Sequence, residues 1–212
     1  MFSFMMEKED AGSYGNAIEY SLNTFSQKDP AQMARRGGGM YQPEKSVILL
    51  PALGQLLQIS YPQGEVTFKG TEVKPLWQWR LLATNYLGRC DGEQLTGDLI
   101  SFRELDGGNA FYPAFLNQTI KQLNQPVEEK SSAELNNTCL QLGGELHGKG
   151  DAGAHLNFFP RFPITVIFWK GDEEIDASAN LLFDEKANHY LHTEDVAVVG
   201  SLVVYFITEL CK

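Results

Sequence analysis

Cysteine is scarce in this sequence. The 212 residues contain Cys90, Cys139 and Cys211, and no two of them form a Cys-x-x-Cys pair. An odd and scattered set argues against a disulfide framework and against a metal or iron–sulfur site built from cysteine alone. We therefore expect the three side chains to be packing residues.

Positive charge is also limited. The sequence has 17 lysine and arginine residues against 27 aspartate and glutamate residues, which gives a formal net charge of −10. Because nucleic-acid phosphates and anionic membranes repel such a chain, we expect neither as a main partner. A small molecule or another protein is the remaining class of partner.

Long apolar runs are missing. A helix that spans a bilayer needs about 20 apolar residues, and the longest apolar run, Val196–Leu210, is shorter and contains Gly200. The apolar start, Met1–Met6, is followed at once by charged residues and lacks the basic flank of a secretory signal. We expect a cytoplasmic protein whose residues 1–11 are flexible.

The common catalytic motifs are absent too. The sequence has no Gly-x-Ser-x-Gly elbow, no His-Glu-x-x-His pair and no cysteine beside a histidine in a known local pattern. The glycines Gly37–Gly39 are not followed by Gly-Lys-Ser/Thr, and they come directly after Arg35-Arg36. That order is typical of a helix end rather than of a phosphate loop.

What the sequence does contain is a pattern of short helices and strands. A hydrophobic content of 43% and an aromatic content of 11% predict one packed domain over residues 1–212. The patterns predict helices at 12–26, 30–36, 74–88, 112–123, 127–142 and 196–210. They predict strands at 46–50, 55–61, 65–69, 100–105, 155–159, 164–169 and 180–183, and an exposed loop at 145–153.

The strands come in hairpin-like pairs rather than in strict alternation with helices. We therefore expect an α+β fold, a largely antiparallel sheet with helices packed on it. Asp29 before Pro30 and Thr193 before Glu194 are the expected N-caps of two helices. We interpret Trp77 and Trp79 as core and edge packing residues.

The densest set of metal-capable side chains follows the predicted strand pair 164–183. It contains Asp184, His189, His192 and Glu194, with Asp195 beside them. Two histidines three residues apart, with carboxylates nearby, are compatible with a divalent metal and with a metal-dependent hydrolase. In the alternative interpretation, Glu194 and Asp195 stabilise a helix start and His189 bonds a loop carbonyl.

A second set consists of candidate ligand-binding residues. They are Arg103, Glu104, Tyr112, Asp172 and Tyr190. An arginine at a strand end can hold a ligand carboxylate or phosphate, and it can equally pair with an acid of the Asp172–Glu174 turn. That turn, with Asp176, is compatible with a hard cation or with a solvated acidic loop.

Several phrases together resemble one known family over nearly the whole chain. The phrases are residues 29–36, 95–105, 107–108, 112–113, 159–163, 169–174, 180–184, 189–191 and 194–195. They are similar to the bacterial and archaeal family catalogued as domain of unknown function 3786. The resemblance implies no established activity. Members occur mostly in anaerobes, and some carry a cysteine-rich iron–sulfur domain, which this chain lacks, or lie beside corrinoid and one-carbon metabolism.

The leading hypothesis is a non-catalytic accessory protein that binds a ligand or partner and serves metallo- or corrinoid-dependent one-carbon metabolism. The alternatives are the metal-dependent hydrolase and a structural subunit of a complex. An apolar cleft lined by tryptophan or tyrosine would favour the binding protein, and a flat apolar patch would favour the subunit. Histidines that converge with a carboxylate would favour the hydrolase.

Overall fold

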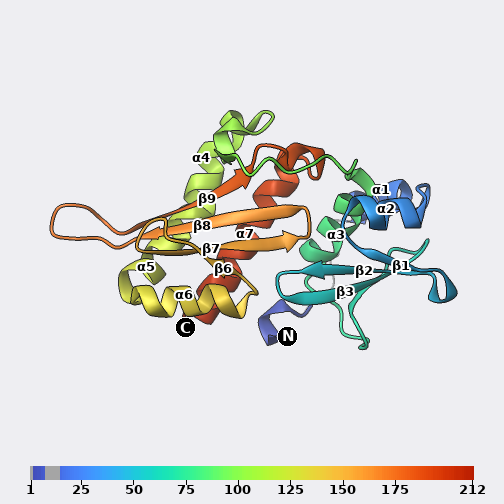
Figure 1. Cartoon of the computed structure of the whole chain (residues 1–212), viewed down its shortest axis with the longest axis horizontal. Helices are drawn as coiled ribbons and strands as arrows, with labels where there is room; N and C mark the ends of the chain where they lie inside the picture. Colours follow the sequence, from blue (N-terminus) through green and yellow to red (C-terminus); the bar gives the residue numbers. More distant parts are fainter. Residues whose placement is uncertain (1, 8–14) are drawn as a thin grey trace.

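Two antiparallel sheets and the helices around them form the protein (Figure 1). The structure is a computed structural model and describes residues 2–7 and 15–212. The four-stranded sheet has the order β1 (Met40–Gln42), β2 (Val47–Ala52), β3 (Gln55–Ser60) and β4 (Val66–Phe68). The five-stranded sheet has the order β5 (Leu99–Ser101), β9 (Ser178–Asp184), β8 (Phe162–Trp169), β7 (Ala152–Phe159) and β6 (Glu145–Leu146). The expected α+β fold is confirmed, with its antiparallel strands divided between two sheets.

The pair of strands predicted around residues 164–183 lies at the centre of the five-stranded sheet. β8 and β9 are antiparallel, with Ile164 opposite Phe183 and Trp169 opposite Ser178. β8 is buried along most of its length, as its continuous apolar sequence indicates. The connection between β8 and β9 projects from the rest of the molecule at the left of Figure 1.

The helices differ in length and in burial. They are α1 (Gly15–Ser26), α2 (Pro30–Arg36), α3 (Trp77–Arg89), α4 (Gly108–Gln118), α5 (Asn124–Glu129), α6 (Ser132–Gln141) and α7 (Thr193–Leu210). Short 3₁₀ turns occupy Ser3–Met5, Pro43–Lys45, Phe102–Glu104, Ile120–Leu123 and Ala187–His189. The most apolar helix, α7, crosses behind the five-stranded sheet in Figure 1 and also packs against α3, α4 and α6.

One of the two expected N-caps is confirmed. Asp29 accepts a hydrogen bond from the backbone N of Gln32 at 2.6 Å, and Pro30 begins α2. The prediction for Thr193 is wrong, because the N-cap of α7 is His192. The Thr193 hydroxyl instead donates to the carbonyl oxygen of Asp106 at 2.6 Å, which ties α7 to a neighbouring loop.

Two capping boxes change the predicted elements. The predicted strand at 100–105 ends at Ser101, whose backbone N and hydroxyl both donate to Glu104 Oε2 at 2.8 Å, and a 3₁₀ turn follows. The predicted helix at 127–142 is two helices, because Ser131 and Glu134 form the same box and begin α6 anew. In both places a local side chain supplies the partner that a continuing strand or helix would have used.

The helix predicted to begin at Tyr112 begins earlier, at Gly108. Its start follows Gly107, which has a φ of +70°, and Pro113 lies inside the helix. Pro126 likewise lies inside α5 and does not end the preceding segment. The residues predicted as an exposed loop at 145–153 include the two-residue strand β6.

Residues 2–7, part of the segment expected to be flexible, are packed against the rest of the protein. Met5 is fully buried, and Met6 forms an isolated bridge with Pro75. The backbone N of Glu7 donates to the carbonyl of Lys74 at 3.0 Å, and its side chain pairs with Arg80. Residues 8–11 of the expected flexible segment and 12–14 of the predicted first helix lie outside the described residues.

The two sheets share one hydrophobic core and meet where their loops touch main chain to main chain. The contact joins Gly54, in the turn between β2 and β3, to Gly143, after α6. Their φ values are +68° and +76°, a conformation that glycine adopts at little cost. A Cβ on Gly143 would lie 2.8 Å from the Cα of Gly54, so neither position has room for a side chain.

The cysteines take no part in a disulfide. Cys90 and Cys139 are buried and Cys211 is half-buried, all as free thiols. Burial raises the pKa of Cys90 to about 11 and of Cys139 to about 12, so both stay protonated. In the described ranges, no helix has the length and apolar content needed to cross a membrane.

Candidate functional site

An apolar groove of about 690 Å³ lies between α3, α4 and α7. Its walls include Trp77 and Leu81 from α3, Phe111 and Phe115 from α4, and Leu202 and Tyr205 from α7. Phe111 is 46% exposed and Tyr205 is 37% exposed, which is unusual for large apolar side chains. The three helices therefore present aromatic surface to solvent inside a concave site.

Close packing of α4 on α7 forms the floor of the groove. A Cβ on Gly200 would lie 2.6 Å from Cε2 of Phe115, so glycine at this position lets the ring approach the α7 backbone. Beside this contact, the hydroxyls of Thr119 and Ser201 are hydrogen-bonded at 3.0 Å. The Ser201 hydroxyl also donates to the carbonyl of Ala197 at 3.0 Å, so both hydroxyl groups in the floor of the groove have hydrogen-bond partners within the protein.

Two polar groups in the groove are less well satisfied. The Oε1 atom of Gln78 is buried and has no hydrogen-bond partner among the described residues. Asp195 accepts a hydrogen bond at Oδ1 from Asn85 Nδ2 at 2.9 Å. Burial raises the pKa of this carboxyl, and the bond from Asn85 opposes the shift. Asp195 lies at the groove wall, whereas the buried Oε1 atom of Gln78 is enclosed by protein.

A second pocket, of about 470 Å³, lies on the other side of Asp195, between α1, α3 and the start of α7. His192 and Glu194, two of the predicted metal ligands, line this pocket. The Nη1 atom of Arg89 donates to Nε2 of His192 at 2.9 Å, so this ring nitrogen is already occupied. Glu194 is exposed in the first turn of α7.

His189 lies elsewhere, in a polar pocket of about 330 Å³ with Arg89, Asp106 and Asn188. Its Nδ1 donates to Oδ2 of Asp91 at 2.7 Å, so the expected partner, a loop carbonyl, is replaced by a carboxylate. Desolvation raises the pKa of Asp91, but hydrogen bonds from His189 and from the backbone of Glu93 outweigh it and the pKa is lowered. The two side chains are 41% and 51% exposed, which is typical of a surface pair.

Asp184, the fourth predicted metal ligand, is buried and holds a loop. Its Oδ2 accepts from the backbone N of Gly97 at 2.8 Å, and its Oδ1 accepts from Lys186 N at 2.9 Å. The structure therefore gives Asp184, His189 and His192 separate partners and leaves Glu194 exposed. Across residues 2–7 and 15–212, no three histidine, cysteine, aspartate or glutamate side chains are gathered closely enough to hold a metal ion.

Among the predicted ligand-binding residues, Arg103 and Tyr112 are neighbours. The guanidinium carbon of Arg103 lies 3.9 Å from the centroid of the Tyr112 ring. Arg103 is exposed and forms no ion pair within the described part of the chain, so of the two alternatives given for it, the pairing with the acidic turn does not occur. Glu104 forms the capping box with Ser101, and these hydrogen bonds lower the pKa of its carboxyl.

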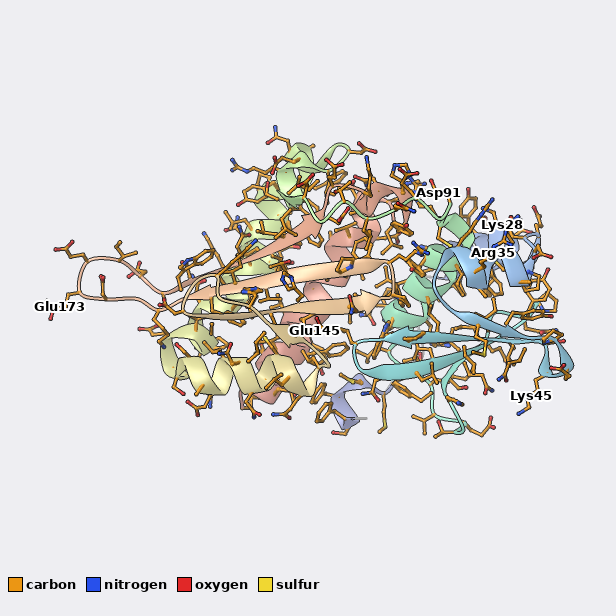
Figure 2. All side chains as sticks on the ribbon, viewed as in Figure 1. Lys28, Arg35, Lys45, Asp91, Glu145 and Glu173 are labelled. Atoms are coloured by element: carbon orange, nitrogen blue, oxygen red, sulfur yellow. The ribbon has the colours of Figure 1, made fainter. Side chains whose placement is uncertain are left out.

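Asp172 and Tyr190 lie apart from that pair. The Oδ1 atom of Asp172 accepts from the backbone N of Glu174 at 2.8 Å and of Ile175 at 2.9 Å, and these bonds lower its pKa. Figure 2 shows Glu173, in the same turn, at the end of the projecting connection and far from Asp91. Tyr190 is fully buried, its ring is stacked on Tyr86 with centroids 5.9 Å apart, and its hydroxyl donates to the carbonyl of Glu93.

Sequence reasoning missed the groove. Trp79 is buried as expected, but Trp77 lines the groove as well as packing at the edge of α3. A signal was present in α7, which is apolar almost all round and so predicts more than one packed neighbour. The identity of those neighbours was not predictable from the sequence, because α3 and α4 come from distant segments.

The groove lies within the part of the chain that matches a family of known proteins. A family model described as Domain of unknown function (DUF3786) matches residues 29–206, a range that includes α3, α4 and the groove-lining part of α7. No curated protein and no solved structure matches the chain.

Proposed function

Because the chain belongs to the family Domain of unknown function (DUF3786), whose name assigns no activity, we propose its function from the groove itself. The protein binds a small, mostly apolar molecule between α3, α4 and α7. The observation that carries this proposal is a groove of about 690 Å³ with exposed aromatic walls.

The size and the lining of the groove both support a small-molecule ligand. Pockets for such ligands usually measure about 300–1,000 Å³ and combine apolar walls with a few polar groups. The groove has apolar walls, and the hydroxyls of Thr119 and Ser201 and the carboxyl of Asp195 supply its few polar groups. Ligand binding would also cover Phe111 and Tyr205, which now face solvent.

The competing hypotheses have less support. A subunit interface is expected to be a flat apolar patch, and the exposed aromatic side chains here line a concave site instead. A metal-dependent hydrolase needs His189 and His192 beside a third ligand, and each histidine has a separate partner. The accessory role in metallo- or corrinoid-dependent one-carbon metabolism stays a prediction that rests on the family resemblance.

A neutral apolar fluorophore tests the proposal. N-phenyl-naphthylamine becomes strongly fluorescent in an apolar site, and we expect saturable binding to the unmodified protein. Ala114→Phe would fill the groove from its exposed edge and weaken binding by about tenfold. Ala133→Phe, at an exposed position of α6 outside the groove, is the matched control and should leave binding unchanged. Absence of saturable binding, or equal loss in both variants, would refute the proposed function.

A further inference from the structure

The groove has a charge preference that its apolar walls do not by themselves require. Among the described residues that line it, Asp195 is the only acidic residue. Lysine, arginine and histidine are absent from this lining. A ligand carboxylate or phosphate would find no cationic donor there, whereas sites for such anions usually provide arginine or lysine.

No ion pair holds Asp195 within the described residues, although its carboxyl lies at the positive N-terminal end of α7 and near His192. Within the described residues its side-chain partner is the neutral amide of Asn85, and no lysine, arginine or histidine forms an ion pair with it. Arg89, the arginine of the adjoining pocket, already donates to His192 and to the carbonyl of Asn188. A partly buried carboxylate without a counter-ion favours a cation in the groove.

The remaining lining groups suit the same kind of ligand. Trp77, Phe111 and Tyr205 offer aromatic rings, whose faces attract organic cations. The net charge of −10 raises the local concentration of cations around the whole molecule.

We propose that the groove binds organic ammonium compounds. The aromatic or aliphatic body of the ligand lies against Trp77, Phe111 and Tyr205, and its ammonium group faces Asp195. This inference rests on the proposed function and adds the charge of the ligand to it.

Three probes that share an indole body test the charge preference by isothermal titration calorimetry at neutral pH. They are tryptamine, which is a cation, indole-3-ethanol, which is neutral, and indole-3-propionate, which is an anion. Tryptamine should bind about tenfold more tightly than the alcohol, and the propionate should bind most weakly. Equal affinity for tryptamine and the alcohol, or tighter binding of the propionate, would overturn the inference.

Charge variants assign the preference to the groove. Asp195→Asn should weaken tryptamine binding by about tenfold and leave the alcohol within about twofold. Glu173→Gln removes the same charge at the end of the projecting connection and should change neither (Figure 2). If Asp195→Asn melts early, Gln118→Glu replaces it, because this exposed substitution at the groove edge should strengthen tryptamine binding. An unchanged tryptamine affinity in a folded Asp195→Asn or in Gln118→Glu would contradict the inference.

The same experiments separate the two proposals. If N-phenyl-naphthylamine and the alcohol bind but tryptamine has no advantage, the proposed function stands and the ammonium preference fails. If no probe of any charge binds, both fail. Size-exclusion chromatography adds one further outcome: a dimer that Ala114→Phe abolishes and tryptamine does not dissociate would assign the groove to a second copy of the chain and overturn the inference.

Discussion

Asn85 on α3 donates a hydrogen bond through Nδ2 to Oδ1 of Asp195 on α7 at 2.9 Å. The residues are 110 positions apart in the sequence, and the bond joins the two helices between the groove and the neighbouring pocket. The same side-chain amide thus stabilises the helix pair and holds the carboxylate in place at the edge of the groove.

Asn85→Ala should therefore lower stability and loosen the groove together. Loss of the amide leaves the half-buried Asp195 carboxylate without this donor, and we expect the free energy of unfolding to fall by about 1–3 kcal/mol. Urea denaturation measures the change. Asn23→Ala, which removes an exposed side-chain bond to Gln27 in α1, is the control and should have a much smaller effect. Equal losses in both variants would contradict a structural role for the Asn85–Asp195 bond.

Two glycines in helices should respond to alanine in opposite directions. Gly200→Ala places a Cβ 2.6 Å from the buried ring of Phe115, and overpacking of this kind costs about 1–3 kcal/mol. Gly88→Ala meets only Thr24 Cγ2 at 3.8 Å, so the better helix propensity of alanine should stabilise by about 0.5–1 kcal/mol. Thermal melting of the two variants gives the comparison. A stabilised Gly200→Ala would show that α4 is not packed closely on α7.

Asp184→Ala should destabilise the protein without changing its metal content. The backbone N–H groups of Gly97 and Lys186 would lose their acceptor, at about 1–3 kcal/mol for each group that stays unpaired. Chemical denaturation measures the stability, and elemental analysis by plasma mass spectrometry measures metal in the same preparations. His192→Ala serves as the comparison, because His192 is exposed. Stoichiometric metal in the unmodified protein that either variant loses would restore the metal-site hypothesis.

The capping box at Ser101 and Glu104 predicts a dependence of stability on pH. Hydrogen bonds from Ser101 lower the pKa of Glu104 in the folded protein. The stabilisation is therefore present above the unfolded pKa of glutamate and is lost as pH falls through the folded pKa. Glu104→Gln should lower the melting temperature at neutral pH, and the difference from the unmodified protein should shrink in acid. Glu128→Gln, an exposed change without this box, should show no such trend.

Arg103→Ala distinguishes a surface stack from a structural clasp. The guanidinium lies over the Tyr112 ring without an acidic partner, so its loss should cost only about 0.5–1 kcal/mol. Arg103→Lys keeps the cation but loses the flat guanidinium. Its melting temperature should lie between those of the unmodified protein and Arg103→Ala. Thermal melting is the measurement. A loss several times larger would mean that Arg103 holds segments together beyond the observed stack.

Local chemistry explains which elements the sequence predicted well. Asp29 and Pro30 define the start of α2 by themselves, and the segment Pro62–Gly64 forms a short turn between the paired strands β3 and β4. The breaks at Ser101 and Ser131 were also readable, because Ser-x-x-Glu is a capping-box pattern. At both positions the apolar periodicity of the flanking residues favoured one continuous element, and the capping-box pattern was overlooked.

The groove and the polar pairs depend on contacts between distant segments. His189 and Asp91 are 98 positions apart, and no spacing in the sequence links them. The predicted metal cluster relied on nearness in sequence. In the structure Asp184 ends a buried strand and His192 precedes a helix. Asp184 accepts from the backbone of Gly97, and His192 accepts from Arg89. Tertiary packing therefore decides the partners of these side chains.

The contact between Gly54 and Gly143 limits how this fold can change during evolution. Most packing faults can be repaired by a smaller residue at the opposing position, but both residues here are already the smallest available. A side chain at either position has to move the two loops apart. This movement would also weaken the adjacent hydrogen bond from Leu53 N to the carbonyl of Asn157, which measures 3.0 Å. We expect no second substitution at the partner glycine to rescue the first. Both positions should therefore remain glycine together during evolution.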